Sequence, residues 1–372
     1  MANRWTALEA LDASILGMFR TMSRAVRPRP RAARFLLRAY RYQRQAVRRR
    51  RRWERRGIHV PAFGIFSVTR RCNLHCAGCY AGALHRSDGA EMTAEQLHGI
   101  LTQARDLGMS IVLLAGGEPL EREDLLDVTA SFPEIVFPMF TNGTLIDEVT
   151  VARLAKQRHV IPVLSLEGDP FMTDARRGAG VHQQVMNAME RLAEAQLLFG
   201  TSITLTRENF DAVTADEYVR ELVNRDCALF FYISYVPAHG GTEDLVLTEA
   251  QAASIAQRVE GFRGRYPAWF LAFPGGEEEF GGCLAAGRGF LHISADGRVE
   301  PCPFSPFSDV SLTEVSLRDA LGSRLLQVIR EHGGELEEST GGCTLWENRA
   351  WVASTLAELQ RDPASVRPGD AD

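Results

Sequence analysis

The chain lacks any long uninterrupted run of apolar residues, and Lys156 is its only lysine. No stretch approaches the roughly 18 apolar residues of a membrane-spanning helix. The first helical stretch is interrupted by Glu9, Asp12 and Arg20, so it has no signal-peptide core. We therefore expect a cytoplasmic protein, which could also sit peripherally on the inner face of the membrane.

The chain has few cysteines, and their number, seven, is odd. Without a secretory signal, this number favours metal binding in a reducing compartment over a disulfide framework. Cys72, Cys76 and Cys79 have the spacing C-x3-C-x2-C and no fourth cysteine nearby. A structural zinc site needs four closed ligands, and a [4Fe–4S] cluster has four irons to ligate. Three thiolates would therefore leave one position open for a small molecule.

The net charge of −5 conceals a strongly basic segment. Residues 24–56 contain 15 arginines and one acid, a local charge of +14, while residues 57–372 carry −19 and residues 1–23 are balanced. This asymmetry favours an anionic partner, either lipid or nucleic acid. The stretches 1–22 and 31–56 have amphipathic helical patterns, which suit a membrane surface, RNA or packing on the protein itself. A solvated basic helix is an equal alternative.

From residue 61 the pattern alternates between apolar strands and amphipathic helices. We expect strands at Phe63–Thr69, Ile111–Ala115, Ile135–Phe140, Ile161–Leu166, Thr201–Leu205 and Leu229–Tyr235, with helices at about 93–107, 121–131, 146–157, 180–198 and 210–224. Strict alternation predicts a parallel sheet with right-handed crossovers. Six units are too few to close an eight-fold barrel, so we predict an α/β fold with a partial (β/α)6 TIM-like barrel. Functional residues should follow the carboxyl ends of its strands.

The chain divides into four predicted regions. They are a basic helical extension (1–60), the barrel (61–247), a small α+β region (248–350) and a C-terminal helix with tail (351–372). In the third region a helix at about 248–264 precedes a hairpin, in which Phe290–Ser294 and Arg298–Pro301 flank an Ala-Asp-Gly turn. A further helix is expected at about 315–331.

Four short motifs follow consecutive predicted strands. They are the cysteine loop at 71–79, Gly116-Gly117-Glu118-Pro119, Thr141-Asn142-Gly143, and Ser165-Leu166-Glu167-Gly168 with Asp174–Gly178 beyond it. In this order they resemble the radical S-adenosylmethionine (SAM) superfamily over about residues 61–235. A zinc site completed by His75 or a distant residue would explain the cysteines and none of the other motifs.

The resemblance implies a [4Fe–4S] cluster on Cys72, Cys76 and Cys79. The amine and carboxylate of SAM would chelate the open iron, and reductive cleavage would yield a 5′-deoxyadenosyl radical that abstracts hydrogen from the substrate. A reductant such as flavodoxin or ferredoxin is implied as well. One departure from the family pattern is Gly78, a position that is often aromatic.

The resemblance also assigns cofactor-binding residues. Gly116 and Gly117 would let the backbone approach the SAM amine, and Glu118 would supply a compensating negative charge. Arg176 or Arg177 would bind the carboxylate by paired hydrogen bonds. The remaining assignments are Asn142, Ser165 and Glu167 to ribose or adenine, and Tyr80 to the adenine face.

A second cysteine set lies in the C-terminal region. Cys283, Gly297 and Cys302 resemble the opening of SPASM and Twitch domains, and only Cys343 follows. The resemblance implies one auxiliary iron–sulfur cluster with three cysteine ligands and an unidentified fourth ligand. Free cysteines or zinc are the alternatives for this set. Cys227, at the entry to a predicted strand, is interpreted as a buried apolar thiol.

Four functions remain open at this point. The first is a radical SAM enzyme acting on a membrane-associated or hydrophobic substrate, which the basic N-terminal segment motivates through an anionic membrane surface at residues 24–56. The second is the same chemistry on a peptide, and the third is RNA modification. The fourth is a non-catalytic iron–sulfur electron carrier or a zinc interaction module.

Overall fold

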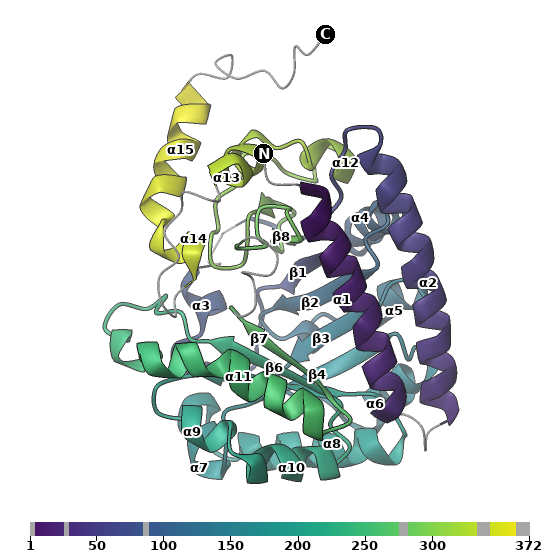
Figure 1. Cartoon of the computed structure of the whole chain (residues 1–372), viewed down its shortest axis with the longest axis vertical. Helices are drawn as coiled ribbons and strands as arrows, with labels where there is room; N and C mark the ends of the chain where they lie inside the picture. Colours follow the sequence, from purple (N-terminus) through teal and green to yellow (C-terminus); the bar gives the residue numbers. More distant parts are fainter. Residues whose placement is uncertain (1–3, 26–29, 85–88, 275–281, 333–342, 362–372) are drawn as a thin grey trace.

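A single nine-stranded sheet forms the centre of the protein in the computed structural model, which describes residues 4–25, 30–84, 89–274, 282–332 and 343–361 (Figure 1). Its strand order is β7-β6-β5-β4-β3-β2-β1-β8-β9. The strands are β1 (Phe63–Thr69), β2 (Ile111–Gly116), β3 (Phe137–Thr141), β4 (Val160–Leu166), β5 (Gly200–Leu205), β6 (Leu229–Ser234), β7 (Trp269–Phe273), β8 (Phe290–Ile293) and β9 (Val299–Glu300). Neighbours from β7 to β8 are parallel, and β9 returns antiparallel to β8. The predicted partial barrel is confirmed.

Helices between consecutive strands cover the outer face of the sheet. They are α4 (Ala94–Leu107), α5 (Leu125–Ala130), α6 (Glu148–Lys156), α7 (Pro170–Arg177), α8 (Val181–Glu194), α9 (Phe210–Val213), α10 (Asp216–Asn224) and α11 (Glu249–Arg265). Thr93 and Gln96 form a capping box that starts α4. The stretch expected as one helix at 210–224 is two helices, α9 and α10.

The sheet is wider than the six predicted strands. β7 extends one edge beside β6, and the C-terminal hairpin extends the other because β8 pairs parallel with β1. The helices that follow the hairpin are α12 (Leu317–Ala320), α13 (Arg324–His332), α14 (Thr344–Glu347) and α15 (Arg349–Arg361). The hairpin of the predicted third region is thus continuous with the barrel sheet.

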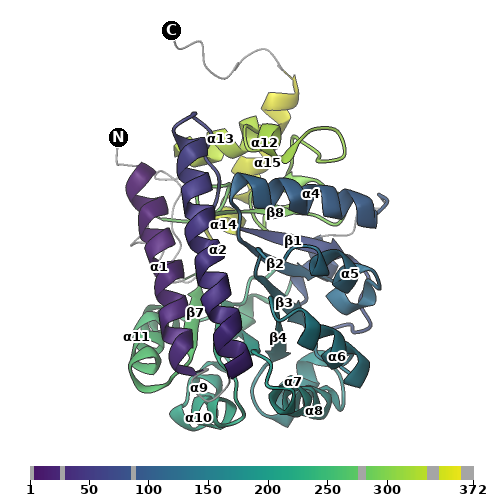
Figure 2. The same cartoon turned by 90° about the vertical axis from the view of Figure 1, so that its right-hand side faces the viewer.

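Two N-terminal helices, α1 (Arg4–Ala25) and α2 (Pro30–Glu54), lie side by side as an antiparallel pair (Figure 2). Their apolar side chains form a buried cluster with residues at the starts of the strands. The α1 members are Leu11, Ile15, Met18, Phe19 and Met22, the strand-start members include Phe63, Ile111, Ile161 and Leu229, and the partly buried Trp269 packs against them. The helix pair therefore closes the amino end of the partial barrel.

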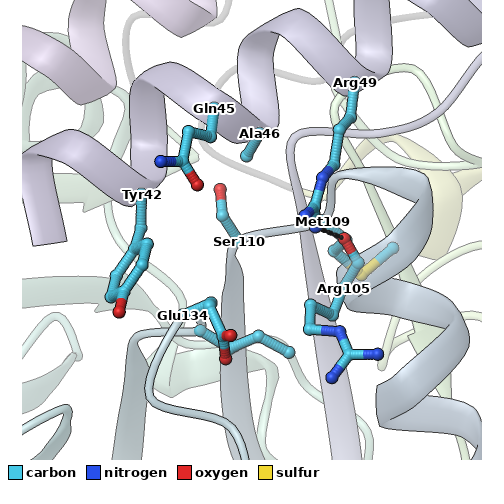
Figure 3. Close-up of a pocket in the computed structure, with 9 residues that line it drawn as sticks. Tyr42, Gln45, Ala46, Arg49, Arg105, Met109, Ser110 and Glu134 are labelled. Atoms are coloured by element: carbon cyan, nitrogen blue, oxygen red, sulfur yellow. Dashed lines mark hydrogen bonds between the residues drawn. The ribbon is translucent and has the colours of Figure 1, made fainter.

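Polar contacts hold α2 in this position. The fully buried guanidinium of Arg50 donates hydrogen bonds to the carboxylate of Asp12 and to the carbonyl of Gly108. Gln43 and Ser110 exchange a second buried hydrogen bond of 2.7 Å. Figure 3 shows a pocket beside α2, where Arg49 reaches the C-terminal part of α4 and donates to the Arg105 carbonyl at 2.8 Å.

The apolar face of each N-terminal helix is therefore used inside the protein. Lipid insertion through a free amphipathic arm, which motivated the lipid-substrate hypothesis, has no support in this arrangement. Among the described residues, no helix combines the length and apolar character that crossing a bilayer requires. What α2 presents to solvent is a row of arginines.

Candidate cofactor site at the carboxyl edge of the sheet

The three cysteines of the first set lie on the loop that leaves β1 and enters α3 (Tyr80–Leu84). Cys72 is exposed, whereas Cys76 and Cys79 are half-buried. Burial raises the pKa of the Cys72 and Cys76 thiols, and the positive charges of Arg177 and Arg176 oppose this effect at Cys76. Nearby guanidinium groups thus favour the thiolate form that a metal ligand requires.

Arg176 and Arg177, at the end of α7, hold this loop from one side. The Ala77 amide donates to the Arg176 carbonyl at 2.8 Å, and Arg176 Nε donates back to the Ala77 carbonyl at 3.1 Å. Arg177 Nη1 lies 3.9 Å from Cys76 Sγ. The turn that carries Cys76 and Cys79 is therefore fixed to α7 by main-chain and side-chain contacts.

Glu167 joins both arginines to the end of β4. Its Oε1 accepts hydrogen bonds from Arg176 Nη1 and Arg177 Nη2, each at 2.5 Å. Its other carboxylate oxygen, Oε2, is buried and has no partner among the described residues. A donor such as a ribose hydroxyl would satisfy that oxygen, and the role predicted for Glu167 stays a prediction. The arginines predicted to bind the SAM carboxylate are here ion-paired with Glu167.

Gly116 and Gly117 pack against the start of the cysteine loop. A Cβ on Gly116 would collide with the Thr69 carbonyl, and a Cβ on Gly117 with the Arg71 carbonyl. The Gly117 amide donates to Thr69 O at 2.7 Å, and the Glu118 amide donates to Arg71 O at 2.8 Å. In this structure the backbone of Gly116 and Gly117 closely approaches the backbone of the cysteine loop, and the expected approach to the SAM amine stays a prediction.

Glu118 links the ends of β2 and β3. Its buried carboxylate accepts hydrogen bonds from Thr141 Oγ1 and the Asn142 amide, both at 2.7 Å. Burial raises the pKa of Glu118, and these hydrogen bonds oppose the shift. Asn142 in turn donates to Asn73 Oδ1 at 2.7 Å, so the third motif also contacts the cysteine loop. The four motifs therefore form one connected site at the carboxyl edge of the sheet.

The two other predicted contacts differ in their surroundings. Ser165 is half-exposed near the end of β4, with its hydroxyl 3.3 Å from that of Ser202. Tyr80 packs against Phe304 of the C-terminal region, with ring centroids 4.9 Å apart. Burial raises the pKa of Tyr80, with smaller effects from Cys79 and Cys302. Tyr80 thus lies between the two cysteine sets.

Two residues that hold the cysteine loop were not predicted. Tyr235, just beyond β6, fills the space above Gly78, where an added Cβ would be 2.5 Å from the Tyr235 hydroxyl oxygen. Gly78 has a φ of 65°, which also favours glycine. His239 Nε2 lies 3.0 Å from the Cys79 carbonyl oxygen. The ring of Tyr235 therefore occupies the space beside residue 78, which has no side chain of its own. In the sequence, only the position of Tyr235 directly after a strand could have indicated this role.

The second cysteine set comes together from three distant segments. The buried Cys302 interacts with Cys343 and Cys283, and these interactions together with burial raise its pKa well above the usual range. Cys227 lies apart from both sets, buried in the main core, where it donates to the Leu229 carbonyl at 3.4 Å. Its interpretation as a buried thiol agrees with this placement.

Within the described ranges, no three His, Cys, Asp or Glu side chains converge closely enough to hold a single metal ion. Neither cysteine set thus has the arrangement of a closed zinc site, in which every ligand contacts the same ion. A [4Fe–4S] cluster has a separate iron for each thiolate, so its ligands need not converge on one point. The donor chemistry fits a cluster, and the unpartnered Glu167 Oε2 fits a polar small molecule beside it.

Fold and site together define an iron–sulfur enzyme with a partial parallel barrel and a cofactor position at the carboxyl edge. Residues 66–218 match the Radical SAM superfamily. This segment is a radical SAM domain, and the cofactors of the superfamily are a [4Fe–4S] cluster and SAM.

Known proteins similar to this chain differ in what their names say they act on. Two come from Methanosarcina barkeri (strain Fusaro / DSM 804). The Fe-coproporphyrin III synthase is 29% identical over 51% of this chain and 49% of its own length. The AdoMet-dependent heme synthase is 23% identical over 84% of this chain and 98% of its own. The chain thus spans about half of the first relative and nearly all of the second.

Among solved structures, Streptococcus suis SuiB bound to precursor peptide SuiA superposes with a TM-score of 0.64. It is 21% identical and covers 82% of this chain and 76% of its own. At this identity the likeness concerns the fold.

Proposed function

We propose that this radical SAM enzyme abstracts hydrogen from a substrate that places an apolar group on the inner face of the partial barrel. The observation that carries the proposal is the exposure of that face. Its amino half is buried under α1 and α2, whereas apolar side chains further along the strands remain half-exposed. They are Ile65, Leu113, Phe140, Ile233, Leu271 and Phe273. Partly exposed apolar walls next to a cofactor site are typical of a binding surface.

The cofactors have matching residues. Cys72, Cys76 and Cys79 would hold the cluster, while Glu167 and Ser165 offer polar atoms to SAM. When bound, the pair supplies one-electron cleavage of SAM and the 5′-deoxyadenosyl radical that takes the hydrogen atom. The chain's own residues fix the cysteine loop through Arg176, Gly117 and Asn142 and leave the inner face open for the substrate. The electron would come from a flavodoxin- or ferredoxin-type partner.

We further propose that Cys283, Cys302 and Cys343 hold an auxiliary iron–sulfur cluster. Their convergence in the folded chain supports this assignment. Tyr80 and Phe304, packed between the two cysteine sets, would lie between the clusters. Both clusters as [4Fe–4S] would give roughly eight irons per chain.

Two substrate classes fit an apolar inner face. A peptide with apolar side chains has support from the SuiB–SuiA complex, and a porphyrin has support from the names of the two Methanosarcina relatives. RNA has less support, because the arginines of α2 lie at the opposite edge of the sheet from the cofactor site. The strands between these edges, such as the seven-residue β1, span roughly 20 Å.

An extract of the host cells, separated by reverse-phase chromatography, tests the apolar substrate. Retained fractions should stimulate 5′-deoxyadenosine release by the reconstituted protein, measured by liquid chromatography. Phe140→Ser should lower this stimulated rate about tenfold, equivalent to losing roughly 1.4 kcal/mol of apolar contact. Val149→Ser, on the solvent face of α6 where Val149 is 68% exposed, should leave it unchanged. Unstimulated cleavage reports an intact cofactor site, and stimulation found only in unretained fractions would contradict the proposal.

We also propose that the arginine face of α2 binds an anionic membrane surface. Arg31, Arg34, Arg38, Arg41, Arg44 and Arg48 are exposed, and none forms an ion pair with a described residue. The exposed Leu37 lies among them. A hollow of about 360 Å³ beside α2 is lined in part by Arg38, Arg153, Lys156 and His159. Arg38 and Lys156 in this lining suit a phosphate headgroup, whereas Asp127, which also lines the hollow, pairs with Arg153 at 2.6 Å.

The membrane surface is best tested by charge reversal of selected arginines. Deleting residues 1–56 is unsuitable, because the deletion would also expose the apolar amino end of the barrel. Arg34→Glu/Arg38→Glu/Arg41→Glu should weaken binding to phosphatidylglycerol vesicles about 100-fold, from about 1 kcal/mol per arginine. Vesicle flotation measures the effect. Arg220→Glu/Arg263→Glu/Arg318→Glu carries the same charge change elsewhere and should bind normally. Equal flotation of both variants, or salt-dependent binding to RNA alone, would refute the membrane surface.

A further inference from the structure

Ser305 is a fully buried residue whose hydroxyl has no hydrogen-bond partner among the described residues. Its backbone is satisfied, since its amide donates to the Cys302 carbonyl at 3.0 Å and its carbonyl accepts from the Phe307 amide at 2.8 Å. Leaving a buried hydroxyl unpaired costs about 1–3 kcal/mol. Such an atom calls for a partner that the polypeptide itself does not provide.

The position of Ser305 points to that partner. Ser305 and Cys302 form an isolated antiparallel bridge across Pro303 and Phe304. Residues directly opposite each other in an antiparallel pair project their side chains to the same face, with Cβ atoms about 4.5–5.5 Å apart. The bridge therefore puts the Ser305 and Cys302 side chains on the same side of the turn, and Cys302 interacts with Cys343 and Cys283. The hydroxyl makes no hydrogen bond to these thiols, so its hydrogen remains available to a sulfur of a bound group.

We propose that Ser305 donates a hydrogen bond to a sulfur of the auxiliary cluster, either the Cys302 thiolate or an adjacent sulfide. This inference rests on the auxiliary cluster proposed above. Thiolate and sulfide are electron-rich acceptors, and hydrogen bonds to cluster sulfurs are one of the terms that set the reduction potential. A donor stabilises the more negatively charged, reduced cluster. Ser305 is thus a positioning and tuning residue that raises the potential of the auxiliary cluster.

The test compares Ser305→Ala with Ser308→Ala in the anaerobically reconstituted full chain. Ser308 is the matched control because its hydroxyl, in the same loop, already donates to the Val310 carbonyl at 2.8 Å. We expect both variants to retain roughly eight irons. In Ser305→Ala alone, the midpoint potential of the auxiliary cluster should fall, measured by redox titration with electron paramagnetic resonance. A solvent-exchangeable proton coupled to that cluster, seen by electron–nuclear double resonance, should also disappear.

The possible outcomes distinguish a failure of the hydrogen bond from a failure of the auxiliary cluster on which it rests. If the parent protein holds only about four irons, the auxiliary cluster does not exist. Eight irons with an unchanged potential and an unchanged proton coupling in Ser305→Ala would overturn the hydrogen bond while leaving the cluster in place. Loss of about four irons in Ser305→Ala would overturn it as well, because Ser305 would then be needed to hold the cluster rather than to tune it.

Discussion

Replacing Cys72 with alanine is expected to abolish 5′-deoxyadenosine release and to lower the iron content from about eight to about four per chain. Two thiolates on a half-exposed loop would remain, too few to keep a cluster with an open iron for SAM. The auxiliary cluster should survive, because its three cysteines come from other segments. Iron analysis and chromatography of the reaction products under strong reductant measure the two effects.

Cys227→Ala is the matched control for this variant. It removes the one thiol that belongs to neither set and lies in the core. Full iron content and normal cleavage are expected for it. Cleavage retained in Cys72→Ala would refute the assignment of the first cysteine set, whereas equal loss in both variants would point to a general effect on folding.

Glu167→Gln is expected to lower the free energy of unfolding by about 3 kcal/mol. The side chains of Glu167, Arg177 and Arg176 are 2%, 11% and 18% exposed, so the substitution leaves two largely buried guanidiniums without their carboxylate. Because Arg176 also pairs with Ala77, the turn that carries Cys76 and Cys79 should loosen. Denaturant unfolding and iron retention during gel filtration measure these effects.

Glu194→Gln provides the comparison, since Glu194 is exposed at the end of α8. This variant should unfold like the parent and keep its iron. Wild-type stability in Glu167→Gln would show that neither arginine depends on the carboxylate, and the account of how α7 holds the cysteine loop would then be wrong.

Much of the fold could be predicted from local patterns. Strands such as Phe63–Thr69 are short apolar runs bounded by turn residues, and amphipathic helices alternate with them. Consecutive parallel strands end at one edge, so the four motifs could be expected to meet there. They do meet, through contacts such as Glu118 with Asn142 and Asn142 with Asn73.

Strand pairing beyond the repeating unit could not be predicted in the same way. β8 joins β1 although more than 200 residues separate them, and no local pattern specifies that partner. The packing partner of α1 could not be predicted for the same reason. The apolar face of α1 is evident in the sequence, but such a face can bind a bilayer as well as it can cover the open end of a barrel.

Side-chain partners were the least predictable part of the site. Gly117 was expected to make room for a ligand, which stays a prediction, and its lack of a side chain also makes room for the Arg71 carbonyl. Ser305 has no motif around it, and only the burial of its hydroxyl and its bridge to Cys302 make it visible. Both features depend on which chain segments meet in three dimensions.

The helix pair at the amino end of the barrel also has a consequence for biosynthesis. α1 is made before every strand of the barrel, yet it packs against strands as distant as β7, which ends at Phe273. At roughly 5–20 residues per second, about 250 residues take on the order of 12–50 s to translate. Throughout that time the apolar side of α1 lacks part of its final partner. A growing chain of this protein must therefore keep an amphipathic helix shielded long before its own barrel can cover it, which makes α1 a natural point of contact for chaperones.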